Sequence, residues 1–378
     1  MEEVSLSEFR EYVAQVAERE IAPRAVEADR NEVFPWDSWR ALAGNDLLGV
    51  NASPDFGGMG LSNQHYAVMI EEITKADPSV AVTVAVHTGL VIHMIETFGT
   101  HEQQNKYLPG LIRGDLLGAF SLSEPNAGSD AGAIKTTAKE TPDGFIINGS
   151  KIFCTSGNIA DIIITFAVTD PDLGKRGISA FIIEKDTPGF SVPRLEHKLG
   201  WRGSPLAQLA FDDAFVPKEN MLGERGAGMK LALTALDTGR VGMAAMGTGI
   251  IAEALRLSSQ YAKERHQFGQ PIGSFGAVAD MIVGMAVAYE AALLLTLNAA
   301  RLKDEGKRFT KEASVAKLFA TEAAMRAAID CIQVFGGYGY TTEYKPERLF
   351  RDAKALSIVE GTNQIQRIVI AREVLGRL

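Results

Sequence analysis

The chain has 378 residues, of which 46% are hydrophobic and 22% are charged, and its net charge is −9. This length is too great for one simple core, so we expect two or three packed units. The acidic balance argues against nucleic-acid binding, which requires basic surfaces. It still allows a local basic pocket for a ligand that carries phosphate.

The cysteine content gives little sign of metal or disulfide chemistry. Cys154 and Cys331 are the only two cysteines and lie far apart in the sequence, so they provide neither a metal-ligand spacing nor a disulfide framework. A reducing compartment is expected. The first residues carry acids and no apolar segment typical of a signal peptide, so a cytoplasmic location without a metal centre is expected.

The first part of the chain has the periodicity of helices. Ser5 and Glu8 have the spacing of a capping box that opens a helix, and Pro23 ends or kinks it. A glycine-rich link at 53–62 predicts a turn. We therefore expect a helical domain over residues 1–116. Further helical patterns cover residues 36–46, 63–75, 80–98 and 101–113.

The pattern changes near residue 117, where short β-branched runs alternate with turn signals. Residues 141–144 read TPDG, a turn in which proline presets one φ and glycine supplies a positive one. We expect a small antiparallel β domain over residues 117–226. The predicted strands cover residues 144–152, 161–168, 177–184 and 207–211.

Helical periodicity returns and continues to the end of the chain. The apolar faces are wide, which suits a bundle that also buries surface against another subunit. The expected helices cover residues 229–265, 275–305, 310–335 and 362–375. The fold class is therefore an α+β multidomain protein, with an N-terminal α-helical domain, a middle antiparallel β domain and a C-terminal four-helix bundle over residues 227–378.

Two apolar stretches, residues 80–95 and 281–300, test whether the chain spans a membrane. The first is short and carries two histidines, and the second carries Tyr289 and Glu290. A spanning helix needs about 20 predominantly apolar residues with few charges. We expect both to be buried helices and predict no membrane span.

Residues 351–367 read RDAKALSIVEGTNQIQR, with Glu360 at the centre. Apolar residues precede Glu360, so partial burial should raise its pKa. Such a carboxylate can remove a proton from a weak carbon acid near neutral pH. Gly361 lets the backbone approach a ligand closely. The alternative is a helix N-terminus, where glutamate is favoured by the helix dipole.

This segment resembles the C-terminal signature of the acyl-CoA dehydrogenase family, whose members remove two hydrogens across the α and β carbons of an acyl-CoA thioester. The resemblance covers nearly the whole chain. It implies that Glu360 is the base and that Gly361 meets the substrate. It also implies FAD between the β domain and the second helical bundle, and a homotetramer built as a dimer of dimers.

A second motif, FSLSEPNAGSD at residues 120–130, is a glycine-containing loop that suits a flavin rim or a phosphate. It matches neither a Walker loop nor the dinucleotide-binding fingerprint, and by itself it indicates a turn. It is similar to the family's T-E-P-x-A-G-S-D motif, and Ser129 is implied to meet both flavin and substrate. The implied flavin contacts are Phe120, Leu122, Ser123, Gly128 and Ser129.

Two further motifs fit the same resemblance. Residues 152–157 read IFCTSG, which is either an ordinary strand end or, as in the family, a place where Phe153 and Thr155 contact flavin. Residues 236–240 read LDTGR, where Asp237 and Arg240 share a helix face as a surface ion pair or, by resemblance, bind CoA. Some family members carry the catalytic glutamate near this position. Gly239 occupies it here, which leaves the role to Glu360.

The last motifs are ERHQFGQPI at residues 264–272 and QVFGGYGY at residues 333–340. Each is consistent with a helix end and a turn. In the family both reach the FAD of a partner subunit. One departure is Gly276, which stands where the family has a glutamine that contacts the cofactor. The implied cofactor contacts are Arg265, Phe268, Gln333, Phe335, Gly336, Gly337, Thr362 and Gln364.

The resemblance implies FAD-dependent conversion of an acyl-CoA to its trans-2-enoyl-CoA, as in fatty acid β-oxidation, with electron-transfer flavoprotein as the acceptor. Two alternatives stay open. One is an oxidase or flavin monooxygenase of the same fold that uses oxygen, and the other is a non-catalytic protein that binds CoA or FAD. Val359 replaces a tyrosine common in relatives, so the length and branching of the acyl group are left open.

Overall fold

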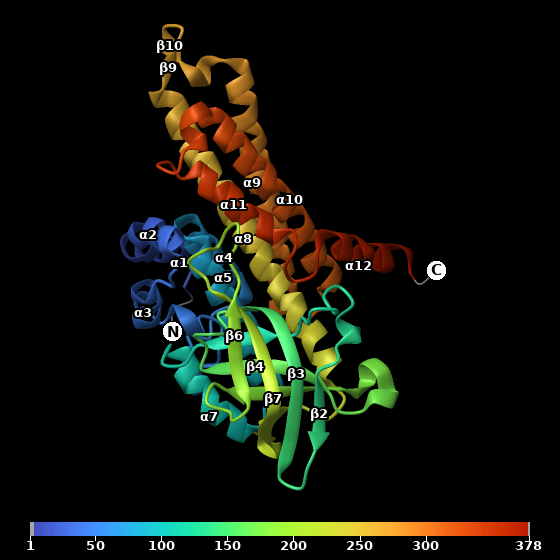
Figure 1. Ribbon diagram of the computed structural model, residues 1–378. Coiled ribbons are helices and arrows are strands. Elements are labelled where there is room, and N and C mark those ends of the chain that lie inside the picture. The colour runs from blue at the N-terminus through green and yellow to red at the C-terminus, as the bar shows by residue number, and fades with distance from the viewer. Residues whose placement is uncertain (1–3, 377–378) are drawn as a thin grey trace.

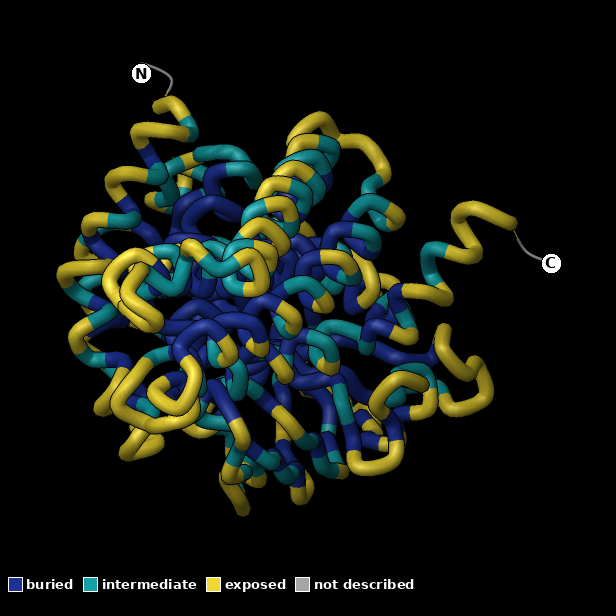
Figure 2. Tube along the Cα trace, turned by 90° about the horizontal axis from the view of Figure 1, so that it is seen from above, coloured by how far each residue is buried: buried dark blue, intermediate teal, exposed yellow. Residues whose placement is uncertain are grey.

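The computed structural model describes residues 4–376 and has the expected order of helices, sheet and helices (Figure 1). The outer ends of the first and third expected domains, residues 1–3 and 377–378, lie outside the described part. Buried residues gather where the helices and the sheet meet, while the far end of the C-terminal helices is mostly exposed (Figure 2).

The N-terminal helices begin at the predicted capping box. The Ser5 hydroxyl accepts a hydrogen bond from the Glu8 amide at 3.2 Å, and the Glu8 carboxylate accepts one from the Ser5 amide at 3.3 Å. Pro23 lies in a short turn that follows the first helix. The α-helices are α1 (Leu6–Val16), α2 (Ala25–Asn31), α3 (Trp36–Gly44), α4 (Asn63–Ala76), α5 (Pro78–Val86), α6 (His93–Phe98) and α7 (His101–Ile112).

The first apolar stretch forms the core of this region. A π-helical segment, His87–Ile92, joins α5 to α6, so Pro78–Phe98 is one continuous helical run. Of its most apolar 18 residues, 94% are buried inside the protein. The prediction of a buried helix is therefore confirmed for this stretch.

The middle domain is one twisted sheet in the order β6-β7-β3-β2-β4-β5-β8, with β1 paired to β4. Most pairs are antiparallel as predicted, but β1 and β2 both pair with β4 in parallel. The strand β1 was not predicted because it is only four residues long. The strands are β1 (Gly118–Ser121), β2 (Thr137–Glu140), β3 (Gly144–Thr155), β4 (Ile162–Val168), β5 (Ile178–Glu184), β6 (Phe190–Leu195), β7 (Leu206–Pro217) and β8 (Met221–Leu222).

The C-terminal domain is built on three long helices that pack together and project away from the sheet (Figure 1). A short hairpin of β9 (His266–Gln267) and β10 (Gln270–Pro271) connects the first two, where the sequence predicted only a helix end and a turn. The helices are α8 (Gly228–Glu264), α9 (Gly276–Asp304), α10 (Thr310–Phe335), α11 (Pro346–Leu356) and α12 (Asn363–Leu375).

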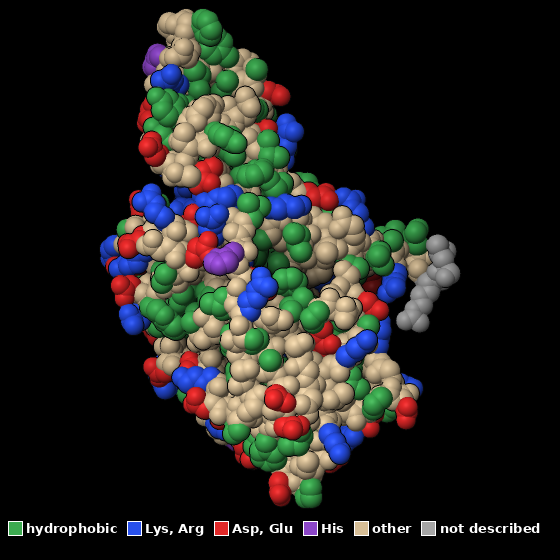
Figure 3. Space-filling model, in the orientation of Figure 1, with side chains coloured by type: hydrophobic (Ala, Val, Ile, Leu, Met, Phe, Trp, Pro, Cys, Tyr) green, Lys and Arg blue, Asp and Glu red, His purple; other side chains and the backbone are tan. Residues whose placement is uncertain are grey.

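The second apolar stretch, in α9, differs from the prediction. Only 11% of its most apolar 18 residues are buried within the chain, because α9 contacts α8 and α10 along one side. Val283, Val287 and Leu294 are 57%, 66% and 66% exposed. Figure 3 shows hydrophobic side chains on the projecting end. The expectation of a helix buried within the chain is therefore wrong for α9.

Arg351 and Asp352 in α11 connect all three domains. The Arg351 guanidinium binds the Asp29 carboxylate of the N-terminal domain at 2.7 Å and donates to the Leu199 carbonyl of the middle domain at 3.2 Å. The Asp352 carboxylate accepts a hydrogen bond from the Trp201 amide at 2.6 Å. The segment that precedes Glu360 is therefore fixed to every part of the fold.

Replacing Arg351 with Met should destabilise the protein, because the carboxylates of Asp29 and Glu347, which both pair with Arg351 at 2.7 Å in a largely enclosed site, would lose their cation. We expect a loss of roughly 3 kcal/mol, since unpairing buried charges is strongly unfavourable. Urea unfolding would measure it. The control is Arg40→Met, which breaks an exposed pair with Asp37 and should change stability by less than about 1 kcal/mol. Equal effects of the two substitutions would contradict the inter-domain role.

Candidate active site

Glu360 lies in the short loop between α11 and α12, with an unusual backbone. Its φ is 55° and that of Gly361 is 84°, so two successive residues adopt left-handed conformations. This conformation is unfavourable for a glutamate. The side chain of Gln366 stabilises it by donating to the carbonyls of Glu360 at 3.2 Å and Gly361 at 2.7 Å. Thr362 then caps α12 through a bond from the Ile365 amide.

The Glu360 carboxylate points into the protein. Its Oε2 atom is buried and has no hydrogen-bond partner among residues 4–376. Burial raises the pKa of Glu360 to about 7, opposed by the positive charges of Arg240 and Lys317. The predicted upward shift of the pKa is confirmed in direction. A carboxylate with these properties can accept a proton near neutral pH.

Gly239 on α8 lies directly against this carboxylate. A β-carbon added at Gly239 would stand 2.5 Å from Oε2 of Glu360 and 3.1 Å from Cδ2 of Leu90. Any larger side chain at this position would therefore occupy the space that the Glu360 carboxylate now fills. A side chain at position 239 of α8 and the carboxylate of Glu360 therefore cannot both occupy this space.

Asp237 and Arg240 form an ion pair that is buried rather than on the surface. Their side chains are 17% and 6% exposed. The Asp237 carboxylate also accepts a hydrogen bond from the Thr310 hydroxyl at 2.6 Å. The interpretation as a surface pair is therefore wrong, since α10 covers the pair. Arg240 also contributes positive potential at Glu360.

The FSLSEPNAGSD loop leaves β1 and is fixed by a buried ion pair. Lys151 of β3 is fully buried, and its Nζ donates to the Leu122 carbonyl at 3.2 Å and the Glu124 carboxylate at 2.8 Å. Glu124 also accepts hydrogen bonds from the amides of Lys135 and Thr136. These contacts hold the backbone of residues 122–124 in one conformation.

The other predicted residues of this region lie around the same loop. The Ser123 carbonyl accepts a hydrogen bond from the Ile152 amide at 2.9 Å, which brings the loop beside the end of β3. Phe153 there has a φ of 56° and is 60% exposed, an arrangement that leaves its ring free for a ligand. Phe120, Ser123 and Thr155 are half-buried, Leu122 is buried, and Gly128 and Ser129 are exposed.

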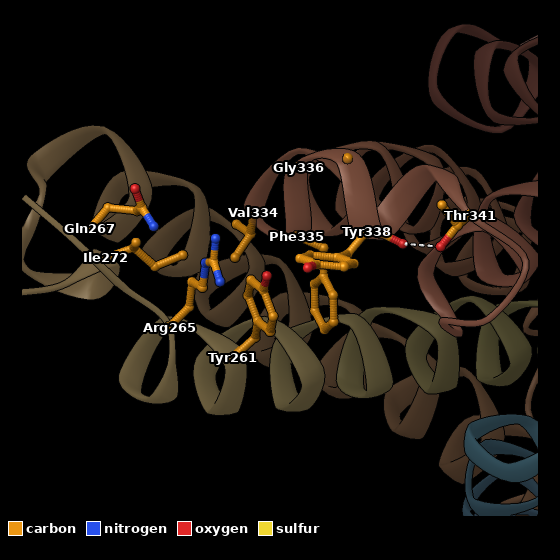
Figure 4. A pocket seen from close by; sticks show the side chains of 10 residues that line it. Tyr261, Arg265, Gln267, Ile272, Val334, Phe335, Gly336, Tyr338 and Thr341 are labelled. Atoms are coloured by element: carbon orange, nitrogen blue, oxygen red, sulfur yellow. Dashed lines mark hydrogen bonds between the residues drawn. The ribbon is translucent and has the colours of Figure 1, made fainter.

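A second group of predicted residues lies at the projecting end of the chain. A cavity of about 470 Å³ opens there, between the end of α8, the hairpin and the end of α10 (Figure 4). Phe335 stacks on Tyr261 with ring centroids 4.1 Å apart, and the Arg265 guanidinium lies 5.8 Å from the Tyr338 ring. The cavity is lined by Tyr261, Arg265, Gln267, Ile272, Val334, Phe335, Gly336, Gly337, Tyr338 and Thr341.

The remaining predicted cofactor contacts are placed as follows. Phe268, at the hairpin turn, is 92% exposed, and Gln333 is exposed beside the cavity. Gly276 is exposed at the start of α9, and a β-carbon added there would meet no atom within 4 Å. Thr362 and Gln364 begin α12, next to Glu360 rather than at the hairpin.

Apart from Thr362 and Gln364, the predicted flavin residues form two groups that one chain does not bring together. The loop after β1 and the end of β3 belong to the sheet, whereas Arg265 and Gly336 belong to the opposite, projecting end (Figure 1). Within residues 4–376, no group of three or more His, Cys, Asp or Glu could hold a metal ion.

Sequence reasoning missed four residues that hold the site in place: Lys151, Lys317, Asp352 and Gln366. The two lysines could have been noticed, because each stands in a segment that is otherwise apolar on its buried face. Lys151 falls on the inward side of β3, and Lys317 falls among alanines of α10. Nothing in the local pattern distinguishes Gln366 or Asp352.

Comparison with known proteins places these features in one family. The N-terminal, middle and C-terminal domain profiles of acyl-CoA dehydrogenases match residues 5–115, 119–214 and 226–375. The chain belongs to the acyl-CoA dehydrogenase family. It is therefore an oxidoreductase, and the predicted fold class and family are both confirmed.

Similar proteins cover the chain almost completely. An acyl-CoA dehydrogenase of Bacillus subtilis is 46% identical over 97% of both chains. A short-chain-specific acyl-CoA dehydrogenase of Clostridium acetobutylicum is 43% identical over 97% of this chain and 96% of its own.

Solved structures agree closely with this fold. Butyryl-CoA dehydrogenase from Megasphaera elsdenii has a TM-score of 0.96 at 40% identity, covering 98% of each chain. A chain from a structure of the electron transferring flavoprotein of Acidaminococcus fermentans has a TM-score of 0.97 at 42% identity. The match covers 100% of this chain and 99% of that one. PigA with FAD and proline gives 0.95 at 31% identity, covering 100% of both chains.

Replacing Gly239 with Ala should lower the rate of acyl-CoA oxidation by roughly 100-fold, because the added methyl group displaces the Glu360 carboxylate by about 1 Å. Stopped-flow measurement of flavin reduction by acyl-CoA would give this rate. Alanine favours helices over glycine, so the fold should not weaken through helix propensity. Gly44→Ala on α3, where a β-carbon also meets no atom within 4 Å, is the matched control and should react normally.

Proposed function

We propose that this chain catalyses FAD-dependent α,β-dehydrogenation of an acyl-CoA thioester to the trans-2-enoyl-CoA, with Glu360 as the base that removes the α-proton. The observation that carries the proposal is the buried, unpartnered Oε2 of Glu360, with a pKa of about 7. Buried carboxyl oxygens normally have hydrogen-bond partners, so an unpartnered one suits a group that exchanges a proton with a ligand.

The loop can also help to acidify the substrate. The α-proton of a thioester is only weakly acidic, so the thioester carbonyl must be stabilised as negative charge develops on it. The amide N–H of Glu360 donates no hydrogen bond among the described residues and is available for that carbonyl. Leu90 and Gly239 lie on the protein side of the carboxylate.

The chain offers suitable contacts for FAD at both groups of predicted residues. Gly336 and Gly337 have open space where a β-carbon would stand, so a cofactor backbone can approach them closely. Arg265 beside them offers a planar cation suited to a diphosphate. The exposed Phe153 suits stacking on a flat ring. FAD bound here supplies the acceptor for the β-hydride.

A second copy of the chain would unite the two groups. The residues at the sheet and those at the projecting end are far apart in one chain, and α9 leaves a wide apolar face uncovered. Apolar faces of this size are typical of subunit interfaces. We therefore propose a homotetramer in which the projecting end of one chain completes the cofactor site of another.

We propose electron-transfer flavoprotein as the electron acceptor. The family membership and the similarity to a chain from an electron transferring flavoprotein structure support this choice. Turnover with electron-transfer flavoprotein and slow reoxidation by oxygen would support a dehydrogenase. Rapid oxygen consumption without that acceptor would instead indicate an oxidase.

Replacing Glu360 with Gln should leave a folded, yellow protein whose flavin is not reduced by acyl-CoA, because the amide cannot accept the α-proton. In the unmodified enzyme, kcat/KM should fall as the pH drops below about 7, since the base must be ionised to act and its pKa is raised to that value. Anaerobic flavin bleaching across pH, with a panel of acyl-CoA chain lengths, would measure both effects.

Normal bleaching in the Glu360→Gln variant would refute the assignment of the base. A protein that is colourless and cannot be reconstituted with FAD would instead favour a non-catalytic role. Glu322→Gln, an exposed glutamate on α10, serves as the control and should bleach at the normal rate.

Replacing Arg265 with Met should weaken FAD binding by about tenfold, because the variant loses a charged contact worth roughly 1.5 kcal/mol. Flavin content after dialysis and flavin titration of the apoprotein would show this loss. Lys263→Met, two residues earlier on α8, tests whether any loss of positive charge at this end has the same effect. Equal flavin content in the unmodified enzyme, Arg265→Met and Lys263→Met would show that Arg265 does not bind the FAD diphosphate.

A further inference from the structure

Lys317 is a buried cation in a helix face made mostly of alanine. Its side chain has no exposed surface, and Ala316 and Ala320 beside it are equally buried. An ammonium group is seldom fully buried unless specific partners stabilise it, because desolvation of the charge is unfavourable. The contacts of Lys317 therefore indicate what this residue does.

The partners of Lys317 belong to the loop that carries Glu360. Its Nζ atom donates to the Gly361 carbonyl at 3.1 Å and to Oδ1 of Asn363 at 2.8 Å. Thr321, one turn later on α10, donates to the same Asn363 oxygen at 3.1 Å. No carboxylate lies within ion-pair distance of Lys317 in the part of the chain that the structure describes. Its direct contacts are with the loop backbone and the start of α12.

These contacts act where the backbone is least favourable. Glu360 and Gly361 both have positive φ, and a loop with such conformations persists only when its surroundings fix it. Lys317 and Gln366 hold the Gly361 carbonyl from two different helices, α10 and α12. Loss of either contact would allow the loop to relax and the carboxylate to leave Gly239.

The charge of Lys317 also acts on the base. Three groups from different helices interact electrostatically with Glu360. Arg240 on α8 and Lys317 on α10 lower its pKa, and Glu360 in turn raises the pKa of Tyr66 on α4. Arg240 and Lys317 favour the ionised carboxylate. Burial lowers the pKa of Lys317 to about 7, with Glu360 and Glu322 opposing this shift and Arg240 adding to it.

We propose that Lys317 is a positioning residue for the reaction, which fixes the Glu360 loop through Gly361 and Asn363 and favours the ionised form of the base. The inference rests on the proposed function of Glu360. It assigns Lys317 no contact with the substrate. A purely structural lysine would affect stability and flavin content but not the pH dependence of the reaction.

The experiment compares three variants as flavin-loaded enzymes. Lys317→Met removes both the charge and the hydrogen bonds, Lys317→Arg keeps the charge, and Asn363→Ala removes one hydrogen-bond partner without changing any charge. Lys311→Met, which removes an exposed lysine from the same helix, is the control. Anaerobic flavin reduction by acyl-CoA is followed from about pH 5.5 to about pH 9, a range that brackets the unperturbed and raised pKa of a glutamate base, together with flavin content and urea unfolding.

For Lys317→Met we expect the acidic limb of the reduction rate to move up by about one pH unit, because the carboxylate loses a nearby cation. The rate above the limb should fall about tenfold, since the base is held less firmly. Lys317→Arg should keep the limb at its original pH. Asn363→Ala should lower the rate without moving the limb, and Lys311→Met should change neither.

The proposal is overturned if the acidic limb of Lys317→Met stays at the pH of the unmodified enzyme, whether or not the rate falls. If Lys317→Met does not fold, the Asn363→Ala variant decides the question. The proposal is then overturned if the acidic limb of Asn363→Ala shifts, or if its reduction rate stays within twofold of the unmodified enzyme. These results differ from failure of the proposed function. In that case the unmodified enzyme is not reduced by any acyl-CoA, or Glu360→Gln reacts normally.

Discussion

The site depends on the Glu360 carboxylate, whose buried Oε2 atom has no hydrogen-bond partner among residues 4–376. Removing Glu360 from water disfavours its charge, which is why its pKa rises to about 7. The positive charges of Arg240 and Lys317 keep the rise from going further. A residue balanced between these opposing effects can hold or release a proton near neutral pH.

The loop geometry that places this carboxylate is maintained from a distance. Arg351 and Asp352 fix α11 to the other two domains, Gln366 and Lys317 hold the carbonyls after the base, and Gly239 leaves the space that the carboxylate fills. Because packed interiors have little free volume, each of these contacts constrains the others. The position of the Glu360 carboxylate is thus a property of three domains rather than of one loop.

Much of this arrangement could be predicted from the sequence, since helical periodicity extends over long segments and the β-branched runs are distinct. The capping box at Ser5 and the raised pKa of Glu360 were both predictable from local residue types. The left-handed φ of Glu360 and the parallel pairing of β1 with β4 were not, because they depend on contacts between distant segments. The same reason explains why Asp237 and Arg240 looked like a surface pair.

The uncovered face of α9 has a consequence for the newly made chain. Val283, Val287 and Leu294 present a hydrophobic surface as soon as the helices have packed. A folded but solitary molecule would therefore be prone to aggregate, and in the proposed assembly the rate of association with another copy would limit that loss. Raising the protein concentration during refolding should thus have two opposing effects on yield. It would speed both the proposed assembly and precipitation, because both use the exposed face of α9.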